Sequence, residues 1–158
     1  MTDFKPISGR CLCGTVRFEV SEPPYGTHYC HCRTCQKMCS APAFAGAYVS
    51  RSAFRLTQGE PKFYKSSPIV ERGLCADCGS YLIYKPLIAE WSDWIIIPIA
   101  CLDHPENFPP EQHYGTEDQV KWFNTRDDLP RERYEENFIE ILSGEDCEAR
   151  RAILERFG

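Results

Sequence analysis

Cys75-Ala76-Asp77-Cys78-Gly79 is the stretch of sequence that decides the fold, together with an earlier stretch, Cys11-Leu12-Cys13-Gly14. Each places two thiols on a turn that ends in glycine, which lets the backbone bend tightly and aim its amides at sulfur. Together they offer four thiolates, the tetrahedral set that a structural zinc ion takes. The sequence therefore predicts a closed zinc site that ties the first strand to the middle of the chain and contributes directly to folding. Its ligands are Cys11, Cys13, Cys75 and Cys78.

A third group, Cys30-His31-Cys32-Arg33-Thr34-Cys35, offers three thiols within six residues. Three protein ligands leave one of the four positions of zinc free for water or substrate, which is the arrangement of catalytic zinc sites. A fourth ligand from elsewhere would close this site, and the spacing leaves that alternative open. The candidates for it are Cys39, His28 and His31. A single cluster that shares all seven cysteines is a further alternative.

The remaining cysteines and histidines have no chelating neighbours. The chain has ten cysteines, and its first ten residues lack the apolar run of a signal peptide, so we expect metal ligands rather than disulfides. Cys101 and Cys147 are expected to be small buried apolar side chains. His104 and His113 are expected to be loop or core residues.

Composition narrows the classes of function. The formal net charge is −5 and the isoelectric point is about 5.4, which disfavours nucleic-acid binding. No apolar stretch reaches the roughly 18 residues that a membrane span needs. We therefore expect a cytoplasmic protein with neither nucleic-acid nor membrane partners.

The chain reads as many short strands with irregular loops, and therefore as a mainly β fold held together by metal. Residues 21–26, with two prolines and a glycine, predict a turn, and residues 102–115 look loop-like. Pro98 indicates an edge position or a bulge for its strand. Strands are expected at residues 16–20, 43–49, 54–58, 63–65, 81–85, 94–100 and 120–123.

Two regions are expected along the chain. Residues 1–130 would form the zinc domain, and residues 131–158 a C-terminal helical extension packed on it. The helix is expected across about residues 145–157. It would fold over the main body or serve contacts within an oligomer.

The cysteine motifs, C-x-C-G, then C-H-C-x-x-C, then C-x-x-C-G, resemble those of the glutathione-dependent formaldehyde-activating enzymes, a family shared with the centromere protein V domain. The similarity covers residues 9 to about 130. The supporting features are Arg72-Gly73, Cys101-Leu102-Asp103-His104-Pro105, Pro109-Pro110-Glu111-Gln112-His113, and Trp122 followed by Asp127-Asp128-Leu129-Pro130.

The resemblance implies a mainly β, Mss4-like fold built around two zinc ions per chain, with the outer cysteines as the structural site. It implies that Cys30, Cys32 and Cys35 hold the catalytic zinc. The activity of the family is a carbon–sulfur lyase reaction, the formation of S-(hydroxymethyl)glutathione from glutathione and formaldehyde. The expected partners are therefore a small thiol such as glutathione and an aldehyde.

The chemistry suits such a site, because a metal-bound thiol is deprotonated and the thiolate is the nucleophile. Nearby cations would bind substrate carboxylates, or are ordinary solvated surface charges. The chain departs from the family at Cys39-Ser40, where a serine or threonine and then a glycine are usual. Cys39 is thus a fourth ligand, a redox partner of a ligand cysteine or a silent replacement. The cations are Arg33, Lys37 and Arg72.

Three hypotheses follow. The leading one is a zinc-dependent carbon–sulfur lyase that acts on thiol–aldehyde adducts at an open three-cysteine site. The alternative is a non-catalytic zinc module that binds a protein partner. The third is rubredoxin-like iron and electron transfer, since four thiolates also hold iron.

Overall fold

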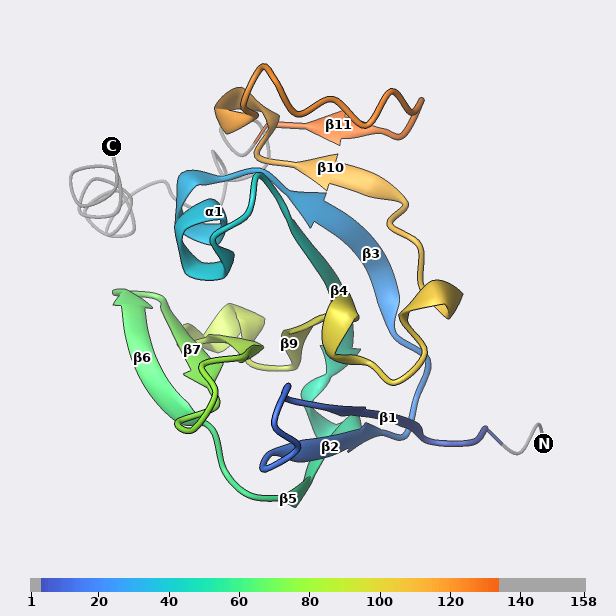
Figure 1. Cartoon of the computed structure of the whole chain (residues 1–158), viewed down its shortest axis with the longest axis vertical. Helices are drawn as coiled ribbons and strands as arrows, with labels where there is room; N and C mark the ends of the chain where they lie inside the picture. Colours follow the sequence, from blue (N-terminus) through green and yellow to red (C-terminus); the bar gives the residue numbers. More distant parts are fainter. Residues whose placement is uncertain (1–3, 134–158) are drawn as a thin grey trace.

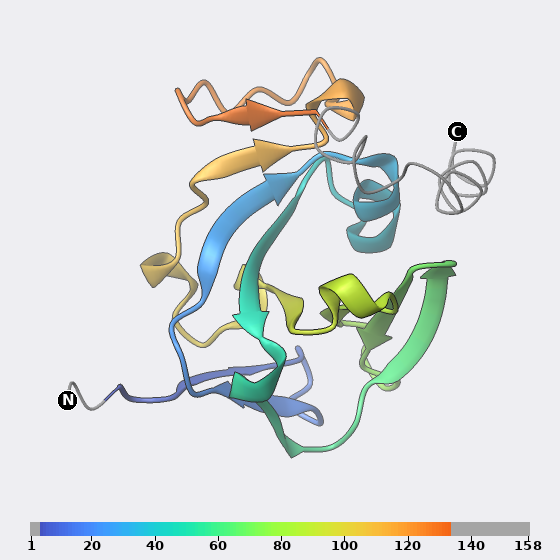
Figure 2. The same ribbon diagram turned by 180° about the vertical axis from the view of Figure 1, so that it is seen from behind.

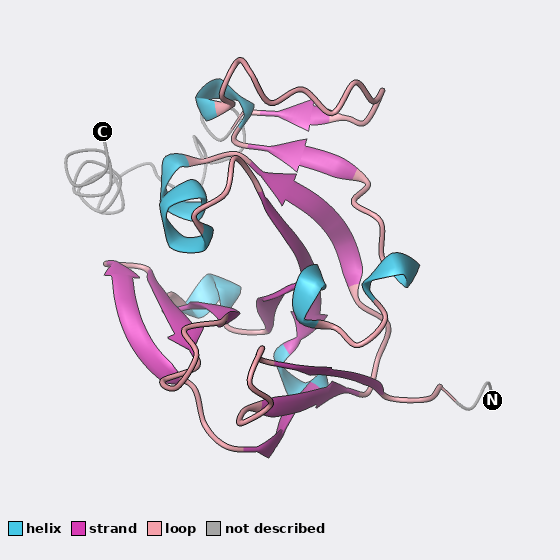
Figure 3. Cartoon of the chain, in the orientation of Figure 1, coloured by secondary structure: helices cyan, strands magenta, loops and turns pink. Residues whose placement is uncertain are grey.

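The fold is built from short β-strands, and the computed structural model describes residues 4–133. Strands dominate this range, in which α1 (Arg33–Cys39) is the one α-helix (Figure 3). The mainly β fold expected from the sequence is therefore confirmed. The remaining helical segments are single 3-10 turns: η1 (Arg51–Ala53), η2 (Ala89–Trp91), η3 (Ile99–Cys101), η4 (Pro105–Asn107) and η5 (Thr116–Asp118).

The strands form two sheets, and the smaller one lies at the bottom of the molecule in both views (Figures 1 and 2). The smaller, antiparallel sheet consists, in spatial order, of β1 (Ile7–Arg10), β2 (Arg17–Val20) and β5 (Phe54–Gln58). In the larger sheet β10 runs parallel to both of its neighbours, whereas the other pairs are antiparallel. Its spatial order is β11 (Arg131–Glu132), β10 (Gln112–Tyr114), β3 (Tyr25–Cys30), β4 (Phe44–Ser50), β9 (Trp94–Pro98), β8 (Tyr81–Pro86), β7 (Val70–Leu74) and β6 (Lys62–Ser67).

Two apolar clusters form because successive side chains of a strand point to opposite faces. Val49 and Ile97 belong to the larger cluster, which includes residues of the smaller sheet such as Phe18. The neighbouring residue Ile96 belongs to the second cluster. This second cluster includes Cys35 of α1, and α1 lies within the curve of the large sheet (Figure 1). The buried members of the second cluster are Cys30, Cys35, Phe44, Tyr81 and Ile96.

Several strands and the helix were not expected from the sequence; they are β1, β3, β7, β10, β11 and α1. β3 begins at Tyr25, inside the predicted turn, and α1 carries Cys35 of the third cysteine group, where no helix was expected. β10 lies within residues 102–115, which look loop-like. The three residues of β10 show no apolar alternation, and they are extended because they pair with β3, a partner that is distant in sequence. Such a strand depends on non-local pairing rather than on its own pattern.

Two strand expectations are wrong. Residues 120–123 form a turn, in which the Phe123 amide donates to the Val120 carbonyl at 3.0 Å, while Trp122 is 77% exposed. Pro98 marks neither an edge strand nor a bulge, because β9 lies between β4 and β8 and pairs with β4 without a register shift. Proline is tolerated there since it is the last residue of β9, where the ladder ends.

The C-terminal region is described only as far as residue 133. Arg131 and Glu132 pair with β10 as β11, so these two residues extend the large sheet. The helix expected at residues 145–157 and the buried position expected for Cys147 lie outside the described residues. Within residues 4–133, no helix is long and apolar enough to cross a membrane.

Candidate metal centres

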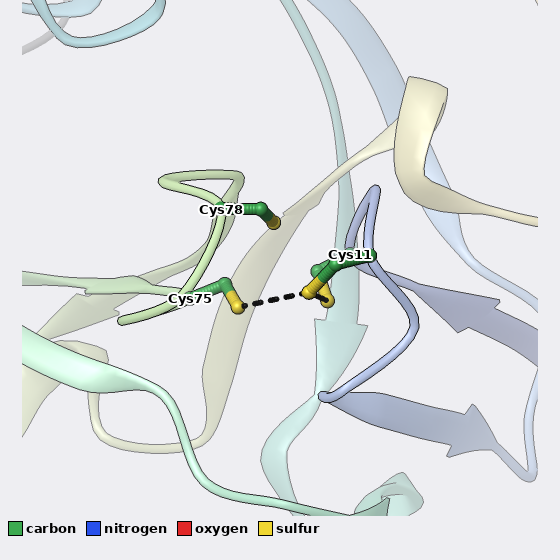
Figure 4. Close-up of side chains that lie close together, drawn as sticks. Cys11, Cys75 and Cys78 are labelled. Atoms are coloured by element: carbon green, nitrogen blue, oxygen red, sulfur yellow. Dashed lines mark hydrogen bonds between the residues drawn. The ribbon is translucent and has the colours of Figure 1, made fainter.

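The outer cysteines come together from two similar turns. Gly14 (φ 79°) ends one turn and Gly79 (φ 76°) ends the other, both in the left-handed region that glycine adopts without strain. The Gly14 amide donates to the carbonyl of Cys11 at 3.1 Å, and the Gly79 amide donates to that of Cys75 at 2.9 Å. Each turn thereby directs two sulfurs to one point, as Figure 4 shows for Cys75 and Cys78 facing Cys11.

The outer sulfurs fit a tetrahedral metal ion. The Sγ atoms of Cys11 and Cys13 are 3.5 Å apart, and those of Cys13 and Cys75 are 3.7 Å apart. Zinc–sulfur bonds of about 2.3 Å in a tetrahedron place the sulfurs about 3.8 Å apart, whereas a disulfide needs about 2.05 Å. The backbone amide of Val16 donates to Cys11 Sγ at 3.3 Å, a hydrogen bond that favours the thiolate form. All four Sγ atoms lie within 4.8 Å of one another.

The middle cysteines gather where β3 ends and α1 begins. Cys30 is the last residue of β3, and Cys32 is the N-cap of α1, where its sulfur accepts the Cys35 amide at 3.4 Å. The Sγ atoms of Cys30 and Cys32 are 3.5 Å apart, which also suits a shared metal ion. Hydrogen bonds from Cys30 and Cys32, together with the Arg72 guanidinium, hold the pKa of Cys35 well below its ordinary value. The arrangement therefore favours a charged sulfur at Cys35.

Each candidate for a fourth ligand of the middle group has another partner. The Cys39 thiol donates to the carbonyl of Cys35 at 2.7 Å, and His28 Nδ1 lies 2.8 Å from the Gly26 carbonyl oxygen. His31 Nε2 lies 2.7 Å from a ring nitrogen of His113. Within residues 4–133, the group that could hold a metal is Cys30, Cys32 and Cys35, separate from the outer four.

Arg72 is buried against the middle group, with only 3% of its surface exposed. Its Nη1 and Nη2 atoms each lie 3.8 Å from Cys35 Sγ. Burial by itself would lower the pKa of Arg72, but the adjacent Cys35 sulfur and the Tyr81 and Tyr84 hydroxyls raise it above its ordinary value. The expectation of a solvated surface charge is wrong for Arg72, whereas Arg33 and Lys37 are exposed.

A buried hydrogen-bonded chain runs from the middle loop to the segment after β10. His31 and His113 are both fully buried, and His113 Nε2 lies 3.0 Å from Asp127 Oδ1. Burial lowers the pKa of His31 to about 4, so its ring is neutral near pH 7. Asp127 is held in turn by Arg131, at 3.2 Å. His113 is thus the core residue that was expected, while its partnership with Asp127 could not be read from a sequence that separates them by fourteen residues.

Two further surfaces lie beside the elements that carry the middle group. Aromatic rings that were not predicted as site residues line the same face of the sheet: Tyr48 and Trp94 have centroids 4.9 Å apart, and Tyr84 stacks on Trp94 at 6.2 Å. A hollow of about 320 Å³ lies beside α1. It is lined by Arg33, Gln36, Lys37, Ser40, Ala41, Pro42, Val120 and Trp122.

The other single cysteine and histidine have local roles. Cys101 is partly buried against the larger cluster, and its thiol donates to the Tyr81 carbonyl at 3.4 Å. His104 is exposed in a loop, with Nδ1 3.1 Å from Glu106. Neither belongs to a group of described residues that could hold a metal.

Comparison with known proteins bears on the same part of the chain. A model of the family described as "Glutathione-dependent formaldehyde-activating enzyme" matches residues 6–118, which contain both cysteine groups. An uncharacterized lyase of Schizosaccharomyces pombe is 32% identical over 78 residues. That alignment covers 48% of this chain and 55% of the relative, so the chain spans about half the length of the curated relative.

A solved structure was also compared. A Rhodobacter sphaeroides protein solved by structural genomics matches this chain with a TM-score of 0.49 and 18% sequence identity. The match covers 79% of this chain and 99% of that one. The family match, rather than this structural likeness, confirms the resemblance drawn from the cysteine motifs.

Proposed function

The chain belongs to the family of glutathione-dependent formaldehyde-activating enzymes, and we propose on that premise that it is a carbon–sulfur lyase acting on adducts of a small thiol and an aldehyde. Glutathione and formaldehyde are the pair that the family description supplies. In the synthetic direction, the thiol sulfur bonds to the carbonyl carbon, and the thiol proton ends on the new hydroxyl group. The lyase direction reverses both changes.

The observation that carries this proposal is a group of three thiols with no fourth cysteine, histidine or carboxylate ligand among the described residues. Cys30, Cys32 and Cys35 would hold a zinc ion, and the outer four cysteines a second, structural one. Zinc at the three-thiol group would supply a free position for the substrate sulfur and keep that sulfur as the reactive thiolate.

The surrounding side chains would bind and shield the substrate. Phe44 and Tyr81 are buried beside the thiols, so they exclude water from the inner side of the group. Arg33 and Lys37, which line the hollow beside α1, offer positive charge to the carboxylates of a thiol such as glutathione. Both lie on the helix that carries Cys35, and substrate binding and metal binding would therefore share one element.

The test is exchange NMR of ¹³C-formaldehyde with glutathione, with the zinc-loaded protein and a panel of other thiols and aldehydes. We expect adduct exchange faster than the uncatalysed rate, and a return to that rate in Cys32→Ser. Cys39→Ser is the matched control, since the Cys39 thiol bonds the backbone carbonyl of Cys35 and not a sulfur of the three-thiol group, and it should keep the acceleration. No acceleration for any pair at full zinc loading would sink the proposal.

Metal analysis separates the other two hypotheses. Iron in place of zinc would favour electron transfer. Four protein ligands on the middle metal, seen by X-ray absorption, would favour a non-catalytic module that binds a partner, because no position would remain for substrate.

A further inference from the structure

Arg72 occupies an unusual position for a charged side chain. It lies on the face of the large sheet that carries the middle group, in a row of paired residues that runs from Tyr48 through Ile96 and Tyr84 to Arg72. Paired residues on neighbouring strands point to the same side of a sheet. The pairing therefore places the guanidinium under α1, away from water, with 3% of the residue exposed.

The neighbours of Arg72 supply hydrogen bonds but no obvious countercharge. Nη1 donates to the Tyr81 hydroxyl at 2.7 Å, and Nε donates to Ser66 Oγ at 3.0 Å. The rings of Tyr81 and Tyr84 lie under the guanidinium, with centroids 5.5 and 5.0 Å from Cζ. No ion pair within residues 4–133 includes Arg72.

A buried charge is costly unless it is paired, so the cation needs an anion close by. Cys35 Sγ is that group, because both terminal nitrogens of the guanidinium lie 3.8 Å from it. Three thiolates around a divalent cation leave one net negative charge. One guanidinium cancels it.

We propose that Arg72 is the counter-ion of the centre formed by Cys30, Cys32 and Cys35: it fixes Cys35 as a ligand and neutralises the centre, so that a further anionic ligand can bind. The thiolate of a substrate then brings the first net negative charge of the centre, whereas without Arg72 it would bring the second. The effect of Arg72 on the metal is independent of any enzyme activity. Its effect on thiolate binding rests on the proposed function.

The first test measures metal affinity without thiol or aldehyde. Cobalt(II) is titrated against a chelator of known affinity, and the sulfur-to-cobalt charge-transfer bands report the two centres. Arg72→Met should weaken the middle centre by about 10–100-fold, the range for partners that orient metal ligands. The outer centre, which Arg72 does not touch, should keep its affinity and serves as the control for folding.

Arg72→Lys separates the effect of the charge from that of the guanidinium geometry. It keeps the positive charge but loses the planar set of N–H donors. We expect its middle-centre affinity to lie between those of the unaltered chain and Arg72→Met. An unchanged middle centre in a folded Arg72→Met variant overturns the proposal, and so does an equal loss in both variants.

The second test adds glutathione alone to the cobalt-loaded protein and follows the shift of the same bands. Binding should weaken at least about tenfold in Arg72→Met, because the glutathione thiolate would then join a centre that already carries an uncompensated negative charge. If Arg72→Met weakens metal binding but leaves glutathione binding unaltered, the claim that Arg72 promotes thiolate binding is overturned, whereas its role toward the metal stands. Normal glutathione binding without any lyase activity would instead contradict the proposed function and leave the counter-ion in place.

If Arg72→Met fails to fold, Tyr81→Phe tests the same contact. It removes the 2.7 Å hydrogen-bond partner of Nη1 and leaves the charge. The middle centre should then keep its metal affinity within a few-fold. A loss as large as 100-fold would assign the effect to hydrogen-bonded packing and overturn the role of the charge.

Discussion

Cys35 and Cys39 lie one helical turn apart on α1 and have different surroundings. The Cys35 sulfur faces Cys30, Cys32 and Arg72. The Cys39 thiol donates back to the Cys35 carbonyl, a local bond typical of a polar side chain within a helix. This difference in direction gives the two cysteines opposite expected effects on metal content.

Cys39→Ser should therefore retain two equivalents of zinc per chain, whereas Cys35→Ser should lose one. A serine at residue 39 can keep the hydrogen bond to the carbonyl of Cys35, and it removes no metal ligand. Elemental analysis after dialysis measures both variants. One equivalent in a folded Cys39→Ser variant would show that Cys39 closes the middle centre.

Gly9 is a position where packing excludes even a methyl group. A Cβ there would lie 2.3 Å from Cζ of Phe18 and 2.7 Å from the backbone oxygen of Cys101. We expect Gly9→Ala to lower the free energy of unfolding by about 1–3 kcal/mol through overpacking. At Gly73 the nearest atoms to a Cβ are 3.2 Å away, and Gly73→Ala should cost less. Urea unfolding compares the two, and equal losses would contradict the steric explanation.

At the scale of elements, β10 shows how a three-residue strand is held in place. It pairs with β3 and β11, and its central residue, His113, connects His31 to Asp127 inside the protein. The segment after β10 is thus fastened to the loop that carries the middle cysteines. A displacement of the segment after β10 should therefore also shift the loop that carries the middle cysteines.

His113→Ala should lower the free energy of unfolding by about 1–3 kcal/mol, because it leaves buried polar partners unsatisfied. His104→Ala is the matched control, since the His104 side chain is 74% exposed, and it should change stability by less than about 0.5 kcal/mol. Denaturant unfolding at constant zinc measures both. Similar losses of unfolding free energy in the two variants would contradict a stabilising role for the buried chain of His31, His113 and Asp127.

At the scale of the whole molecule, the outer cysteines join the two sheets. Cys11 follows β1 in the smaller sheet, and Cys75 follows β7 in the larger one. Both are buried within the larger apolar cluster, with 1% and 2% exposure. A metal ion there would close a long loop and couple assembly of the two sheets.

The stability effects of Cys11→Ser and Cys75→Ser should therefore not add. Either substitution alone removes the shared metal centre. The double variant should therefore be about as stable as the less stable of the two single variants. Thermal unfolding of the two single variants and the double variant gives the coupling. Additive losses would mean that the two turns contribute separately and share no metal ion.

The sequence by itself indicated the two cysteine groups, because thiols on one short turn are close through the covalent chain. It also indicated most strands, such as β2, β5 and β8, since apolar alternation is a local property. The family resemblance came from the same local motifs. Apart from the pairing of the two outer cysteine turns, these predictions required no knowledge of which segments meet.

Only the tertiary structure decided what surrounds the groups. Arg72 reads in sequence as one more charged residue, and the register of β7 against β8 together with the position of α1 buries it beside Cys35. His113 likewise reaches Asp127 only because β10 pairs with β3. Such contacts join residues that are distant in the chain, and their strength comes from burial, which no local pattern encodes.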